Sequence, residues 1–126
     1  MGREFETLKR RADFLRVAHI GLRSAGPSLV LQAAARPGAS QGSAGIRAMG
    51  IRVGFTASRK VGKAVCRNRA KRRLRAAAER VLPVHGRPGI DYVVIARRGT
   101  GDQPFSALLC DLEAALRRIE HSRVRR

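Results

Sequence analysis

Residues 59–75 of the 126-residue chain read RKVGKAVCRNRAKRRLR and carry nine lysines and arginines without a single acid. At about 100° per residue, the small and apolar side chains of this stretch and its continuation fall within a stripe of roughly 120°. That stripe consists of Cys66, Ala70, Leu74, Ala77, Ala78 and Val81, and the opposite side and its flanks carry Asn68, Arg69, Lys71, Arg72 and Arg75. The pattern therefore predicts a helix over residues 63–82 that packs one face on a core and exposes a row of cations.

Most charged helix faces are simply solvated, but they usually carry acids four residues away that offset the repulsion. Here the first acid is Glu79. Like charges along several turns are relieved when phosphates bind and release their counterions, so the row favours a polyanion as partner. Arg67 lies near the edge of the apolar stripe and must bend around it to reach phosphate.

The charge of the whole chain supports the same partner. Lys and Arg number 27 against 9 Asp and Glu, a formal charge of +18, which favours nucleic acid or an anionic membrane. No run approaches the roughly 18 apolar residues of a spanning helix, and no signal peptide is evident, so we expect no membrane partner. Hydrophobic residues make up 44% of the chain, enough for a single folded domain over residues 1–126.

The residues that usually carry catalysis or metals are scattered. Cys66 and Cys110 form neither a disulfide framework nor a metal knuckle, which indicates a reducing, cytoplasmic compartment; we expect Cys66 in the core and Cys110 exposed. Asp111 and Glu113 are two apart on a helix and do not face each other. The histidines, His19, His85 and His121, lie in three separate segments. We therefore expect neither a catalytic residue nor a metal ligand on the protein.

The rest of the pattern predicts alternating helices and strands. An amphipathic helix is expected over residues 4–20, a half-buried strand over 28–35, a mobile loop over 36–50, a strand over 50–58, a buried strand over 90–96, a helix from about 104, and a frayed tail over 120–126. The second of these strands has a core face of Ile51, Val53, Phe55 and Ala57. Its other face, Arg52, Gly54, Thr56 and Ser58, is small and polar and could lie under an extended ligand.

Residues 61–72, VGKAVCRNRAKR, preceded by Ser58, Arg59 and Lys60, closely resemble the "RNR" signature helix of the bacterial ribonuclease P protein component. The resemblance extends in order over residues 7–119. Leu8-Lys9, Asp13-Phe14 and Gly21 are similar to the family's first helix, RVGF at 52–55 to the strand before the signature, and DYVVIAR at 91–97 to the last strand.

This resemblance implies an α+β fold, a two-layer, ribosomal-protein-like sandwich with the order αβββαβα and a left-handed βαβ crossover. It implies an accessory subunit of an endonuclease whose RNA subunit is the catalyst. That RNA uses Mg²⁺ to release the 5′ leader from precursor tRNA. The implied partners are the ribonuclease P RNA and precursor tRNA. No protein partner is implied, and the protein alone is expected to be inactive.

The resemblance also implies two binding surfaces. The catalytic RNA would be contacted by Arg59, Lys60, Lys63, Arg67, Asn68, Arg69, Lys71, Arg72 and Arg75, and the leader would lie in a cleft of Phe14, Gln32, Arg52 and Thr56. The family often has further aromatics where this chain has Ala18 and Gln32. Phe14 could stack on a base or fill the core of its helix, and both interpretations stay open.

Two rival functions share parts of this pattern. A ribosomal protein or another RNA-packaging module would share the charge and a similar fold but would have no effect on precursor tRNA. A nucleoid-type protein would share the charge alone and would prefer duplex DNA at the same salt concentration.

Overall fold

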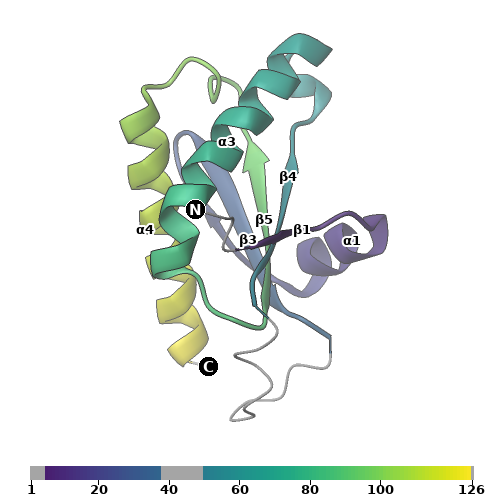
Figure 1. Ribbon diagram of the computed structural model, residues 1–126, viewed down its shortest axis with the longest axis vertical. Coiled ribbons are helices and arrows are strands. Elements are labelled where there is room, and N and C mark those ends of the chain that lie inside the picture. The colour runs from purple at the N-terminus through teal and green to yellow at the C-terminus, as the bar shows by residue number, and fades with distance from the viewer. Residues whose placement is uncertain (1–4, 38–49, 126) are drawn as a thin grey trace.

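The structure, a computed structural model, describes residues 5–37 and 50–125. Its strands are β1 (Glu6–Thr7), β2 (Leu22–Ala25), β3 (Leu29–Ala35), β4 (Arg52–Thr56) and β5 (Ile90–Ala96), and its helices are α1 (Arg11–Ile20), the short 3-10 helix η1 (Arg59–Val61), α3 (Ala64–His85) and α4 (Phe105–Arg125). The strands form one sheet in the order β1-β4-β5-β3-β2. Helices α3 and α4 cover one face of the sheet and α1 packs on the other (Figure 1). The predicted α+β class is confirmed.

The main core lies between the sheet and the pair α3 and α4. From α3 it takes Ala70, Leu74, Ala77, Ala78 and Val81, and from α4 Leu108, Leu112, Leu116 and Ile119. The predicted stripe of α3 is therefore confirmed, with one exception. Cys66 is exposed, because the first turns of α3 project beyond the end of the sheet and Ala70 is the first residue of the helix to meet the core (Figure 1).

The connection from β4 through α3 to β5 joins two parallel neighbouring strands. In Figure 1 both strands point upward, α3 passes in front of the sheet, and β5 lies to the left of β4. This is the left-handed crossover implied by the family resemblance, and it is the rare hand for such connections.

The first helix is shorter than predicted. Residues 6 and 7 form strand β1, which pairs in parallel with β4, and α1 begins only at Arg11. Phe5 and Leu8 are three apart, as on one face of a helix, but in extended chain that spacing sends them to opposite faces of the sheet. Phe5 joins the main core and Leu8 the smaller core under α1.

The first long strand, β3, is buried on both faces rather than on one. Leu29, Leu31 and Ala33 face α3 and α4, while Val30, Gln32 and Ala34 are also buried, on the α1 side. The sheet has a further edge strand, β2, which lies next to β3 and which the alternation of only four residues did not reveal.

The ends of the remaining helices also differ from the pattern. Helix α3 continues past Pro83 to His85, because a proline in the last turn removes only one amide donor, and the amide of Gly86 still donates to the carbonyl of Leu82 (2.7 Å). Helix α4 continues to Arg125, through most of the tail expected to fray. The expected mobile loop over 36–50 lies mostly outside the described residues.

Gly54 sits at the centre of the sheet face that α1 covers. A Cβ built on Gly54 would lie 2.3 Å from Cε1 and 2.4 Å from Cζ of Phe14, and 3.1 Å from Cβ of Leu8. The ring of Phe14 therefore rests on bare backbone, and the glycine sets how closely α1 approaches the sheet.

We expect Gly54→Ala to destabilise the protein by about 1–3 kcal/mol, because the added methyl group must push the Phe14 ring and α1 outward. Urea unfolding followed by circular dichroism measures the change. The control is Gly101→Ala, where the nearest atom to an added Cβ is Cδ of Arg69 at 4.0 Å and the effect should be small. Equal midpoints for Gly54→Ala and the parent protein would contradict the close approach.

Candidate nucleic-acid interface

The basic segment begins on η1 and continues along the projecting end of α3. The side chain of Ser58 caps η1 by accepting from the amide of Lys60 (3.3 Å), and Lys63 is the N-cap residue of α3. Arg59, Lys60 and Lys63 are all exposed. The structure thus places the three cations predicted at the helix entrance on one continuous turn leading into α3.

Several polar and cationic side chains in the first half of α3 are exposed and unpaired among the described residues. Asn68, Arg69, Lys71 and Arg72 are exposed, and none has a side-chain hydrogen bond or ion pair with another described residue. We call Arg69, Lys71 and Arg72 the α3 cation row. Because Ala70 and Leu74 on the same turns are fully buried, the helix cannot rotate to relieve the repulsion between these charges.

Two other predicted contacts differ from that row. Arg67 is half-buried, and its Nε is a buried donor with no partner, which agrees with a side chain that bends around the apolar stripe. Arg75 forms an ion pair with Glu79 one turn later (3.6 Å), so part of its charge is already neutralised.

The four residues predicted for the leader cleft share one sheet face. Gln32 on β3 and Gly54 on β4 both pair with Val93 of β5, Arg52 and Thr56 flank Gly54, and the Phe14 ring covers it. Gln32 is only 8% exposed, and Phe14 and Thr56 are half-buried. Phe14 packs beside the small core of Leu8, Val17, Ala34 and Val93, with part of its surface still accessible.

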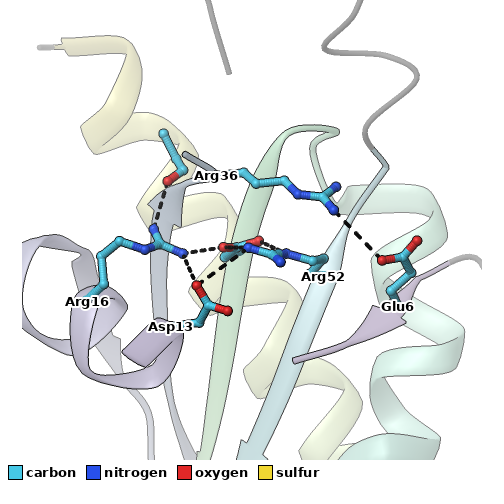
Figure 2. Close-up of polar contacts among 7 residues, drawn as sticks. Glu6, Asp13, Arg16, Arg36 and Arg52 are labelled. Atoms are coloured by element: carbon cyan, nitrogen blue, oxygen red, sulfur yellow. Dashed lines mark hydrogen bonds and ion pairs between the residues drawn. The ribbon is translucent and has the colours of Figure 1, made fainter. Parts of the chain in front are cut away.

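Arg52 is held by a buried carboxylate (Figure 2). Its Nε and Nη2 donate to Oδ1 (2.8 Å) and Oδ2 (2.6 Å) of Asp91, a side chain with no exposed surface. Arg16 of α1 also donates to Asp91 and, through Nη1, to the carbonyl of Ala35 (2.9 Å), while Asp13 lies 3.4 Å from Arg16 and 3.8 Å from Arg52. The hydrogen bonds from Arg52 to Asp91 hold the pKa of the guanidinium above its ordinary value.

The open end of this sheet face is a cationic groove that sequence reasoning missed. It has a volume of about 900 Å³, and its floor includes Val30 and Ile95, which are cross-strand neighbours. Its charged and polar lining is Arg23, Ser58, Lys60, Arg97 and Arg98, with no acid among the lining residues. We call it the β-end groove. The pair Arg97-Arg98 directly after a buried strand was the available signal, because residues at strand ends gather at one edge of a sheet.

Within residues 5–37 and 50–122, no three of the His, Cys, Asp and Glu side chains come close enough together to hold a metal ion. His19, His85 and His121 lie on three different helices, and both cysteines are exposed. No described helix is long and apolar enough to cross a bilayer. Among the described residues the arrangement offers two cationic surfaces, the exposed α3 cation row and the β-end groove, whose lining holds no acid.

Comparison with known proteins gives a consistent result. The family model for ribonuclease P matches residues 3–120. The chain is 51% identical to the ribonuclease P protein component of Paramagnetospirillum magneticum over 119 residues, covering 94% of this chain and 86% of that protein. It is 52% identical to that of Ruegeria pomeroyi over 113 residues, covering 89% and 84%.

Solved structures agree. The ribonuclease P protein of Thermotoga maritima superposes with a TM-score of 0.70 at 27% identity, covering 90% of this chain and 97% of that one. The protein from Staphylococcus aureus superposes with a TM-score of 0.67 at 27% identity, covering 88% and 92%.

Replacing the buried carboxylate should show how far α1 depends on it. We expect Asp91→Asn to lower the free energy of unfolding by about 3–5 kcal/mol, since the two guanidinium groups would then share only the more distant carboxylate of Asp13 as counter-charge. The measurement is the urea midpoint, with the exposed Asp102→Asn as a control that should change little. If both variants unfold at the parent midpoint, the cluster does not hold α1 in place.

Proposed function

The chain belongs to the family of ribonuclease P protein components, and on that premise we propose that its two cationic surfaces bind two different RNAs. It is the accessory protein subunit of the ribonuclease P endonuclease, which matures the 5′ end of tRNA. The α3 cation row, together with Arg59, Lys60, Lys63, Arg67, Asn68 and Arg75, binds the ribonuclease P RNA. The cleft of Phe14, Gln32, Arg52 and Thr56 and the adjoining β-end groove bind the 5′ leader of precursor tRNA. Lys60, which also lines the groove, lies at the border between the two surfaces.

The observation that carries this proposal is the state of the α3 cation row. Arg69, Lys71 and Arg72 are exposed, unpaired among the described residues, and held in one orientation by the buried side of the helix. A rigid row of this kind neutralises several phosphates of a folded RNA at once and gains the entropy of the released counterions.

The leader proposal rests on a different kind of surface. The open half of the sheet face offers Thr56, the edge of Phe14 and the cations of the β-end groove, which together supply a stacking surface and backbone charges for a single strand. Arg52 contributes a positive charge in a fixed position, because its Nε and Nη2 donate to Asp91.

Magnesium belongs, in this proposal, to the RNA subunit and the substrate. The described carboxylates do not fit a protein-held magnesium site, since no three of them come together and Asp13 and Asp91 are both paired with arginine. The cytoplasmic location expected from the cysteines stays a prediction.

The proposed function is tested by reconstitution. The purified chain alone should leave precursor tRNA intact, whereas the chain with a bacterial ribonuclease P RNA should release the 5′ leader at a magnesium concentration too low for the RNA by itself. The products are resolved on a denaturing gel. Cleavage of precursor tRNA by RNA-free protein, or no stimulation of the RNA, would overturn the proposal.

The α3 cation row should determine the salt dependence of RNA binding. We expect Arg69→Ala/Arg72→Ala to flatten the slope of log K against log[salt] for ribonuclease P RNA by about 1.4–1.8 units, at about 0.7–0.9 per phosphate contact. Arg87→Ala/Arg117→Ala removes the same charge near the C-terminal end of α3 and should leave the slope nearly unchanged. Equal slopes for the two double variants would show that the α3 cation row is solvated and makes no phosphate contacts.

Phe14 can be tested for base stacking separately from packing. We expect Phe14→Leu, which still covers Gly54 but cannot stack as well, to weaken binding of precursor tRNA to the assembled enzyme. Loss of a stacked base costs on the order of 1–3 kcal/mol, about 5-fold to more than 100-fold in affinity.

In the same variant, affinity for ribonuclease P RNA and for mature tRNA should stay close to the parent values. Leu15→Ala, on the exposed side of α1, is the matched control. Parent affinity for precursor tRNA in Phe14→Leu would make Phe14 a packing residue only.

A further inference from the structure

The loop between β5 and α4, residues 97–104, touches both proposed RNA surfaces. On one side Arg97 and Arg98 line the β-end groove. On the other side the loop contacts α3: a Cβ on Gly101 would lie 4.0 Å from Cδ of Arg69, and Arg73 donates to the carbonyls of Thr100 (2.7 Å) and Gln103 (2.5 Å). This loop is therefore a physical link between the groove and the α3 cation row.

We propose that Arg73 is a positioning residue rather than an RNA contact. Together with the carbonyls of Thr100 and Gln103 it forms what we call the Arg73 clamp, which fixes α3 relative to the β-end groove. The inference rests on the proposed function, because that proposal assigns the two surfaces whose relative placement the clamp sets.

The geometry of the guanidinium supports this role. Nη1 binds one carbonyl and Nη2 the other, so both ends of the planar fork are used within the protein, and the side chain is half-buried. A rigid fork that meets two acceptors orients one element against another more firmly than a single flexible donor does. Its neighbour Arg72 is exposed and has no such partner among the described residues.

The far side of the loop is anchored as well. Thr100 is fully buried, and its Oγ1 donates to the carbonyl of Ser28 (2.7 Å) and accepts from the amide of Arg97 (2.7 Å). Ser28 in turn donates from its amide (3.1 Å) and hydroxyl (2.5 Å) to Asp111 of α4, and Arg97 donates to the carbonyl of Gly26 (2.8 Å). Because the loop is held at both sides, a constraint on α3 is also a constraint on the groove.

Loss of the clamp and loss of a phosphate contact should change different properties of the assembled enzyme. Both surfaces keep their own charges, so affinity for ribonuclease P RNA and its salt dependence remain. What declines is the preference of the assembled enzyme for precursor over mature tRNA, because the leader meets the groove while α3 is held by the RNA.

The experiment compares Arg73→Lys and Arg73→Ala with Arg72→Ala, each assembled with ribonuclease P RNA. Arg73→Lys keeps the charge but cannot reproduce the fork. We expect both Arg73 variants to reduce the ratio of precursor to mature tRNA affinity by about 2- to 30-fold, with the RNA salt slope at its parent value. Arg72→Ala should lower the slope by about 0.7–0.9 and leave the ratio alone.

Hydrogen exchange gives a direct measure of the loop. The amides of Asp102 and Gln103, which donate to the carbonyl of Gly99 (2.9 and 3.1 Å), should exchange faster in both Arg73 variants. Circular dichroism and the urea midpoint check that each variant is folded. If Arg73→Ala does not fold, the precursor preference of Arg73→Lys alone tests the clamp.

Two results would overturn the clamp. One is an unchanged precursor preference in folded Arg73→Lys, and the other is a lower salt slope in Arg73→Ala that Arg73→Lys restores, which would make Arg73 a phosphate contact. A different result would contradict the proposed function itself. If both Arg72→Ala and the double variant Arg69→Ala/Arg72→Ala keep the parent salt slope, the α3 cation row does not bind ribonuclease P RNA. The two failures are therefore distinguishable.

Discussion

The arrangement of the sheet face that α1 covers depends on one buried carboxylate. Asp91 lies on the central strand β5 with no exposed surface, and a charge there is tolerated only because Arg52 and Arg16 surround it. Because Arg16 comes from α1 and Arg52 from β4, the carboxylate of Asp91 holds the helix against one end of this sheet face. The other end of the face stays open. Phe14 then comes to rest on Gly54, and the β-end groove begins where α1 no longer covers the strands.

The strongly periodic parts of the fold could be predicted from the sequence. The stripe from Ala70 to Val81 is buried as the helical period requires, β5 coincides with the apolar run at 90–96, and the core face of β4 is the one that alternation selects. These hydrophobic patterns are local and repeat over several turns or residues. A single residue that breaks the pattern therefore does not hide the element. The cations of the α3 cation row follow from the same period, since their buried neighbours determine which way they point.

The parts that escaped prediction depend on partners distant in sequence. Strand β1 exists because β4 lies beside it, and the spacing of Phe5 and Leu8 fits a helix equally well. The pairing of Arg52 with Asp91 joins residues 39 positions apart, and the bonds of Arg73 reach 27 and 30 positions along the chain. No period distinguishes Arg73 from Arg72. Likewise the exposure of Cys66 follows from where the sheet ends, and that is a property of the assembled fold.

The projecting end of α3 has a consequence for the thermodynamics of assembly. Its first turns have backbone hydrogen bonds but little tertiary packing, and adjacent like charges oppose their helical order. The turns before Ala70 gain tertiary packing only from a partner, and in the proposed complex the ribonuclease P RNA supplies it. The heat capacity and entropy of complex formation then contain a folding contribution from the protein, in addition to that of the released ions.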